Sequence, residues 1–255
     1  IMLSMLKGSK LVNHKDFNPS LQDAASIRAI PQVHGACRNA ILDAYNTACI
    51  ELNSATDNPL IFRKGKKVES ISGYNPHGEA LALGAEQMGL ACSEFGIISE
   101  KRISRLLSPH HSGLPNFLSP NPGLNSGLMI PQYVAAALVS ENKLNSRPIV
   151  GETMSTSANQ EDHVSMGTIA AEKCLVIAKR SKHILSIEIL TACQAIEFCD
   201  PARLGVGTAF IYKNVRKLVA PLDEDRILHK DIESLIAFVE SNALIAPLES
   251  LVGDL

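Results

Sequence analysis

Apolar residues recur at intervals of three and four along most of the chain, the spacing of one face of an α-helix. After Pro31 this pattern continues to Leu52, where a run rich in Asn, Asp and Pro stops it. Residues 77–107 contain no proline and predict one long helix or two abutting ones. Residues 125–145 predict another helix, in which Pro131 is tolerated only in the first turns.

The longest pattern predicts a helix from about Asn159 to about Cys199. At ~1.5 Å per residue, such a helix is ~60 Å long, longer than a compact domain of this size is wide. It is therefore expected to run through a subunit interface, so an oligomer is predicted. One apolar stripe steps by four and three, as in a coiled coil, through Ala171, Leu175, Ala178, Lys182, Leu185, Ile189, Ala192 and Ile196.

The remaining segments are short. Residues 60–62 and 68–71 flank a basic turn and predict a β-hairpin, while the four prolines within 109–122 predict a loop. Shorter helices are expected near 208–219 and 231–242. The predicted fold class is therefore all-α, a bundle of long helices with at most one short β-hairpin, and residues 1–255 are expected to be one domain or part of one.

Composition narrows the functional classes. The net charge of −2 gives no electrostatic case for binding nucleic acid or an anionic membrane. No apolar stretch reaches the roughly 20 residues that span a bilayer, and no signal peptide is visible. The six cysteines lie within apolar helical patterns, without the close pairs of a zinc site or a disulfide scaffold. A cytoplasmic, reducing location with core thiols is expected.

The run from Ser157 to Gly167 concentrates amide, carboxylate and imidazole side chains at the predicted start of the longest helix. Ser157 and Gln160 have the spacing of a capping box, and Glu161 is an acid that a first helical turn favours. Capping does not require consecutive Gln, Glu, Asp and His, however. Glu161 is therefore also a candidate to hold a cationic or hydrogen-bonding ring.

Two other places carry candidate chemistry. Arg28 lies in a loop at a helix entrance, where its guanidinium is either an ordinary surface group or a bidentate clamp for a carboxylate. His77 and Glu79 follow a tight turn and resemble metal ligands, but no third ligand stands at a diagnostic spacing, so no metal is expected. The sequence contains no dinucleotide fingerprint, P-loop or nucleophile elbow.

Eight stretches, in order across about two thirds of the chain, resemble the aromatic amino acid ammonia-lyases. The Gln-Glu-Asp-His form of the last stretch is similar to the histidine branch of that family, whose phenylalanine-type relatives carry an amide where Glu161 stands. The matching stretches are residues 22–23, 31–36, 51–59, 98–103, 112–115, 124–130, 135–143 and 157–167.

The resemblance implies a helical homotetramer in which each active site draws residues from three subunits. It implies a methylidene-imidazolone (MIO) electrophile, formed from an internal Ala-Ser-Gly, and elimination of ammonia from L-histidine to give trans-urocanate. By position, Arg28 would bind the substrate carboxylate and Gln22 would line the electrophile and substrate. Glu161 would contact the imidazole ring, and Gln160 beside it would belong to the substrate-binding set.

The sequence departs from the family pattern at three points. No Ala-Ser-Gly occurs in it. The family places that tripeptide well upstream, so the chain is expected to correspond to the C-terminal half and to be inert without its N-terminal complement. The apolar start, Ile1 to Leu6, also predicts upstream sequence.

The other two departures are substitutions. Ala25 stands where the family has a tyrosine of the catalytic apparatus, and loss of such a group typically costs on the order of 10²- to 10⁴-fold in rate. Pro76 stands where a phenylalanine usually precedes His77, which removes an aromatic wall worth ~1 kcal/mol beyond burial.

Three alternatives stay open. The first is a lyase that acts on another aromatic amino acid. The second is an impaired homologue, or a scaffold or pseudoenzyme without activity, which Ala25 and the missing tripeptide favour. The third is the wider fumarase and aspartase group, of which Asn125 to Pro131 is only a loose echo.

Overall fold

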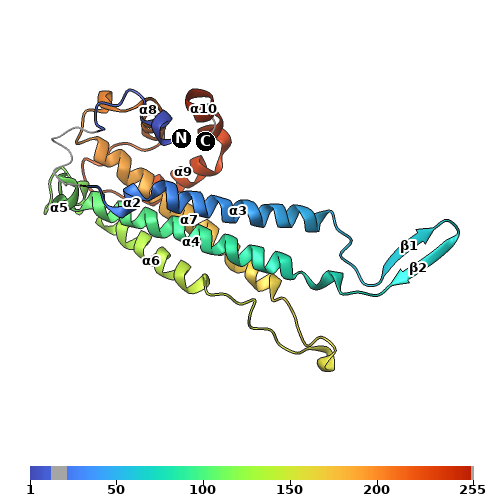
Figure 1. The fold of residues 1–255 in the computed structure, drawn as a ribbon. Helices are drawn as coiled ribbons and strands as arrows, with labels where there is room; N and C mark the ends of the chain where they lie inside the picture. Colours follow the sequence, from blue (N-terminus) through green and yellow to red (C-terminus); the bar gives the residue numbers. More distant parts are fainter. Residues whose placement is uncertain (13–21, 254–255) are drawn as a thin grey trace. The chain divides into compact units, whose positions relative to one another are not determined.

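The computed structural model describes residues 1–12 and 22–253. Within them the chain is a set of helices with a single two-stranded sheet, which confirms the all-α prediction (Figure 1). The principal elements are α2 (Ala25–Arg28), α3 (Ile30–Leu52), β1 (Leu60–Lys64), β2 (Lys67–Ile71), α4 (Glu79–Leu107), α6 (Met129–Asn145), α7 (Gly167–Ile196), α8 (Val206–Leu218), α9 (His229–Glu240) and α10 (Asn242–Val252).

The predicted helices after Pro31 and after His77 are confirmed as α3 and α4, and α4 is continuous. Helix α3 ends where two polar side chains bond its last carbonyls. Asn53 donates to the Cys49 carbonyl oxygen and Ser54 to that of Ile50, each at 2.7 Å. These bonds provide donors for carbonyl groups that the end of a helix leaves without an intrahelical partner.

Helix α7 corrects two predictions. It begins at Gly167, so its 30 residues extend ~45 Å instead of ~60 Å. The capping box at Ser157 and Gln160 is wrong, because Ser157, Ala158 and Asn159 have φ of 51°, 53° and 68°. These left-handed values do not continue into a helix. The run therefore forms one 3₁₀ turn, Ser157–Asn159, followed by irregular chain up to Gly167.

The hairpin is confirmed, with Lys64 paired to Lys67 and Leu60 to Ile71. Its turn is Gly65 and Lys66, and Gly65 has the left-handed φ of 62° that a two-residue hairpin turn requires. In Figure 1 the hairpin extends away from the helices that flank it in sequence.

Three smaller differences complete the comparison. The predicted loop 109–122 contains one helical turn, Pro109–Ser112, and one 3₁₀ turn, Asn116–Leu118. Helix α6 starts four residues later than predicted, which places Pro131 in its first turn. Helix α10 was not predicted and holds Pro247 inside it.

The chain divides into two compact units. The first comprises Ile1–Ile30, Gly96–Ser140 and Arg180–Leu255, and the second comprises Pro31–Phe95 and Glu141–Lys179. The first unit has a continuous apolar core built from large side chains that are almost fully buried, among them Ile103, Leu107, Leu118, Leu128, Ile184, Ile187 and Leu235.

The second unit buries small side chains. Ala82, Val150 and Ala170 form one buried cluster, and Cys37, Ala44, Ala91, Cys174 and Ile177 are buried as well. Glycines on α4 permit this close packing. A Cβ on Gly89 would lie 3.3 Å from the Ile177 Cδ1 atom, and one on Gly84 would lie 3.6 Å from the Ala44 Cα atom.

The six cysteines are free thiols. Burial raises the pKa of Cys92 and of Cys193 to about 11. A thiol with so high a pKa stays protonated near neutral pH and is a poor nucleophile. These two residues therefore act as packing groups.

Among the described residues, no single helix is both long and apolar enough to cross a membrane. Helix α9 and residues 243–252, which meet at a bend of 59°, are together long and apolar enough for a span, by length and composition alone.

Candidate functional site

The candidate ring-contacting carboxylate lies in the second unit. Tyr74, at the N-cap of the 3₁₀ turn Asn75–His77, donates its phenol hydrogen to Glu161 Oε2. This hydrogen bond is the main reason that the pKa of Tyr74 is raised, with desolvation and the charges of Glu161 and Asp162 adding to it. Tyr74 is therefore a neutral donor that fixes the direction of the Glu161 carboxylate.

Backbone bonds hold the segment that carries Glu161. The Thr156 amide donates to the Glu161 carbonyl oxygen at 2.7 Å, and the Glu161 amide donates back to Thr156 at 3.3 Å. The Val164 amide donates to Thr153 Oγ1 at 2.8 Å. The left-handed residues 157–159 form the tip of this small loop. Strain of this kind concentrates at functional sites.

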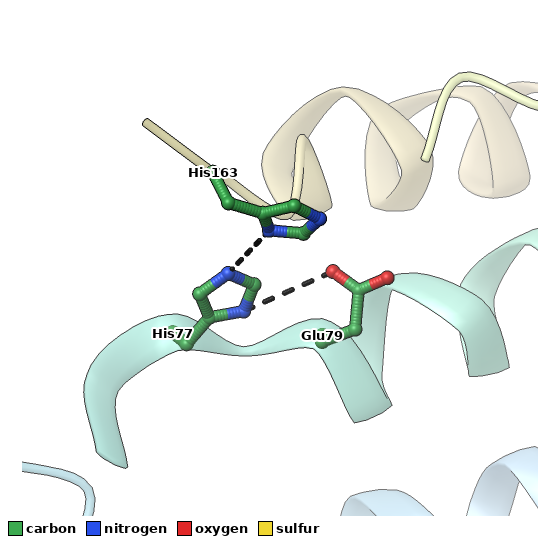
Figure 2. Close-up of side chains that lie close together, drawn as sticks. All are labelled: His77, Glu79 and His163. Atoms are coloured by element: carbon green, nitrogen blue, oxygen red, sulfur yellow. Dashed lines mark hydrogen bonds and ion pairs between the residues drawn. The ribbon is translucent and has the colours of Figure 1, made fainter. Parts of the chain in front are cut away.

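A row of imidazole and carboxylate groups lies beside it (Figure 2). His77 Nε2 is 2.9 Å from His163 Nδ1, and the two rings stack with centroids 5.1 Å apart. The other nitrogen of the same ring, His77 Nδ1, is 3.8 Å from Glu79 Oε2. Figure 2 shows the three side chains grouped together, with dashed lines from His77 to each of the other two.

Two pockets open on this part of the second unit. One, of about 470 Å³, is lined by Tyr74, Pro76, His77 and residues 164–169. The other, of about 550 Å³, is lined by Pro76 and by residues at the end of α3 and after it, including Glu51. Both volumes fall within the range of small-molecule sites. Pro76 contributes to both walls.

An ion pair fixes the chain that leads to the Glu161 loop. Lys173 on α7 lies 3.1 Å from Glu86 Oε1 on α4, and both side chains are largely buried. Lys173 also donates to the Arg147 carbonyl oxygen, while Glu86 accepts the Ile149 amide hydrogen at 2.8 Å. Two helices thus clamp residues 147–149, where the chain leaves α6.

The other candidate residues lie in the first unit. Gln22, Ala25 and Arg28 are exposed, and Ala25 and Arg28 are the first and last residues of α2. Arg28 Nε donates to the Asp23 carbonyl oxygen at 2.7 Å, which orients its guanidinium.

An ion pair supports α2. Arg102 donates to the Ser26 carbonyl oxygen at 3.4 Å and pairs with Glu188, to which its second nitrogen donates at 2.9 Å. The backbone between Ala25 and Arg28 is therefore attached to α4 and α7.

The structure thus groups the predicted residues in two sets. Gln22, Ala25 and Arg28 share one short segment, but Arg28 is the last residue of the helical turn α2, whereas the sequence predicts a loop there. Pro76 and Glu161 come together through Tyr74, which lines the pocket beside Pro76 and bonds Glu161. Gln160 is exposed, and its amide donates to the Ser157 carbonyl oxygen at 3.0 Å.

Sequence reasoning missed Tyr74 and the role of His163. Tyr74 lies in the tight turn predicted before His77, and His163 lies in the run 157–167 that carries candidate chemistry. Their partners are 86 and 87 residues away, and no local spacing indicates such a contact.

Comparison with known proteins decides the family. The model of the aromatic amino acid lyases matches residues 1–217. The chain belongs to this family. The histidine ammonia-lyase of Alkaliphilus metalliredigens is 45% identical over 254 residues, which cover 100% of this chain and 50% of that protein. The histidine ammonia-lyase of Symbiobacterium thermophilum is 47% identical, over 92% of this chain and 46% of that protein.

Solved structures of the family share the fold. Histidine ammonia-lyase from Trypanosoma cruzi superposes with a TM-score of 0.87 and 43% identity, over 91% of this chain and 45% of that one. Tyrosine aminomutase from Streptomyces globisporus gives a TM-score of 0.90 at 34% identity, over 100% of this chain and 51% of that one. The chain spans about half the length of these relatives.

Proposed function

We propose that this chain works as the C-terminal half of a histidine ammonia-lyase, which eliminates ammonia from L-histidine to give trans-urocanate. The observation that carries the proposal is Glu161, a carboxylate in the Gln-Glu-Asp-His run whose direction a phenol fixes beside a small-molecule pocket. Relatives named histidine ammonia-lyase, 45% to 47% identical over nearly the whole chain, support it.

Glu161 would accept a hydrogen bond from the imidazole ring of the substrate. A carboxylate beside an imidazole orients the ring and favours its protonated form. Tyr74 would share the same carboxylate and keep it in place while the substrate enters. Gln160, next in sequence, would contribute its amide to the same end of the site.

Arg28 would bind the carboxylate of the amino acid. A guanidinium presents two parallel N–H donors to a carboxylate, which fixes orientation as well as affinity. Its Nε bond to the Asp23 carbonyl holds the fork in one direction. Gln22, six residues earlier, would line the same end of the substrate.

The electrophile of the reaction would come from outside this sequence, which contains no Ala-Ser-Gly. We propose that an N-terminal half of the same enzyme supplies the methylidene-imidazolone, whose chemistry is to capture the substrate as an electrophile. Without that half this chain would hold substrate-contacting groups and no reactive centre, so it would be inert alone.

Two residues, Ala25 and Pro76, favour a second candidate function: an impaired homologue, or a lyase for another aromatic amino acid. Ala25 has no hydroxyl to move or hold a proton, and Pro76 has no aromatic ring to line the pocket. Both point to an impaired homologue or a pseudoenzyme, or to a different aromatic amino acid as substrate. For the last possibility, a structural relative is named tyrosine aminomutase.

We further propose a cytoplasmic homotetramer in which sites are shared between subunits, with no nucleic-acid, membrane or metal requirement for the reaction. Large apolar side chains that the isolated chain leaves exposed support the assembly. Leu175 and Leu185, on the predicted α7 stripe, are 56% and 38% exposed. The six free thiols agree with a reducing compartment.

The test is a chimera that joins the N-terminal half of the A. metalliredigens enzyme to this chain. Urocanate formation from L-histidine is followed by absorbance, with Ala25 and with Ala25→Tyr. The tyrosine variant is expected to be active, and the Ala25 form to be slower by about 10²- to 10⁴-fold. Glu161→Gln in the active chimera is expected to remove a further large part of the rate with histidine.

Intact mass gives the control. A chimera whose Ala-Ser-Gly has cyclised has lost two waters, which shows that the electrophile segment has folded. If such a chimera with Ala25→Tyr leaves L-histidine unchanged, the proposed substrate is wrong. If it converts tyrosine or phenylalanine instead, the other aromatic amino acids take its place.

A further inference from the structure

Three metal-ligating side chains of the second unit converge on one point. One ring nitrogen of His77, one ring nitrogen of His163 and one carboxylate oxygen of Glu79 all lie within 4.8 Å of one another. The two imidazole nitrogens are 2.9 Å apart. Ligands at ~2.1 Å from a tetrahedral Zn²⁺ are about 3.4 Å apart, so small rotations of the side chains would admit an ion.

Glu79 supplies a second, independent observation. Its Oε2 atom is buried and has no hydrogen-bond partner among the described residues, although it lies 3.8 Å from His77 Nδ1. The Glu79 side chain is 37% exposed as a whole, but a buried carboxylate oxygen without a donor is costly, because that oxygen has lost its water and gained no hydrogen bond in exchange. A cation held between this oxygen and the two rings would remove that cost.

We propose that His77, Glu79 and His163 bind a divalent transition-metal ion of the zinc class. Two imidazoles and one carboxylate are the protein ligands of many zinc sites, which keep a fourth position for water. The site goes beyond the proposed function, since no step of the elimination uses it. Spacing along the chain does not reveal it, because His163 follows Glu79 by 84 residues.

The ion would join two segments that otherwise meet through few bonds. His77 ends the 3₁₀ turn that precedes α4, Glu79 is the first residue of α4, and His163 lies in the loop that carries Glu161. A bound metal would cross-link that loop to α4 two residues from the ring-contacting carboxylate. Binding to the folded form alone also raises thermal stability, in proportion to the logarithm of ion concentration over Kd.

The experiment titrates the full 255-residue chain with Co²⁺, a coloured substitute for Zn²⁺, and follows visible absorption. Native mass spectrometry counts the Zn²⁺ ions that displace it. One ion per chain is expected, with the intense d–d bands of a four-coordinate site. His163→Ala is expected to weaken binding by about 100-fold or more, since even outer-shell changes cost 10- to 100-fold.

The matched control is His111→Ala, which removes an exposed histidine whose ring lies 5.0 Å from that of a second one, His110. It is expected to leave the titration unchanged. Glu79→Gln is the second variant. It is expected to weaken ion binding while the circular dichroism spectrum stays the same. An unaltered titration in both His163→Ala and Glu79→Gln, or no uptake by the unsubstituted chain, overturns the proposal. Because the readout is metal uptake, it does not depend on urocanate formation.

Discussion

The two units of the chain differ in what they bury. The first buries large aliphatic side chains such as Ile103, Leu118 and Leu235 in one continuous cluster. The second buries mainly alanine and cysteine, with glycines on α4 that let helices approach closely. Apart from Val150 and Ile177, many of its large apolar side chains are exposed, among them Leu52, Ile50 and Leu175, at 83%, 66% and 56%.

This difference separates two tasks. Burying large apolar side chains supplies the first unit with its own stability, at roughly 25 cal/mol for each Å² removed from water. The second unit carries the Glu161 loop, the two histidines and two pockets, and it leaves apolar surface exposed that the proposed assembly would cover. Stability in the first unit is therefore local, whereas in the second it is expected to depend on polar clamps and on assembly.

The largest effect is expected from the apolar core. Leu235→Ala in the first unit should lower the free energy of unfolding by about 2–5 kcal/mol, because it removes a fully buried side chain and leaves a cavity. Urea denaturation followed by circular dichroism measures the change. Leu175→Ala in the second unit is the matched control and should change the unfolding of the isolated chain by less than about 0.5 kcal/mol. Equal losses in the two variants would erase the contrast between the units.

A smaller effect is expected from the clamp of the second unit. Lys173→Met should cost about 2 kcal/mol, less than the 3–5 kcal/mol of a fully buried pair, because Glu86 would lose its partner but can recruit water. Hydrogen exchange should accelerate at the Ile149 amide, which Glu86 holds.

The comparison is Lys182→Ala, which breaks the exposed pair with Glu240 in the first unit and should cost under ~1 kcal/mol. If Lys182→Ala lowered the free energy of unfolding more than Lys173→Met does, the Lys173 to Glu86 pair would not be a main source of stability in the second unit.

The smallest effect is expected from the titration of Tyr74, as a change of stability with pH. Its pKa is raised above the unfolded value of about 10, so the folded state holds the phenol proton more tightly. The stability from the Tyr74 to Glu161 bond is therefore fully present below about pH 10 and is lost as pH rises through the folded pKa. Tyr74→Phe should flatten stability against pH in that range, and Glu161→Gln should lower the pKa of Tyr74 in an ultraviolet titration. If the pKa of Tyr74 is the same with and without Glu161→Gln, the two side chains do not form a hydrogen bond in solution.

Much of the fold follows from local pattern. Helices α3 and α4 and the hairpin are where apolar spacing, prolines and the basic turn at Gly65 predict them, because each depends on neighbours within a few residues. The start of α7 does not follow. Residues 157–166 read as a helical first turn, but left-handed backbone at Ser157 and Asn159 and the bridge between Thr156 and Glu161 displace it to Gly167.

The buried face of α7 is the second lesson. Apolar residues occur all around this helix, so the sequence offers several stripes and cannot rank them. The structure buries Ala170, Cys174, Ile177 and Ile184, and leaves Leu175, on the predicted coiled-coil stripe, mostly exposed. The role of that stripe in a subunit interface stays a prediction.

By itself, the sequence determined the helical class, the two short runs that carry the candidate chemistry, and the resemblance that family comparison confirmed. Only the tertiary structure decided which side chains in those runs meet: Tyr74 with Glu161, and His77 with His163 and Glu79. Helix and turn formation depend on residues a few positions apart, and a pattern records them. Contacts across more than eighty residues depend on how helices pack, which no local spacing encodes.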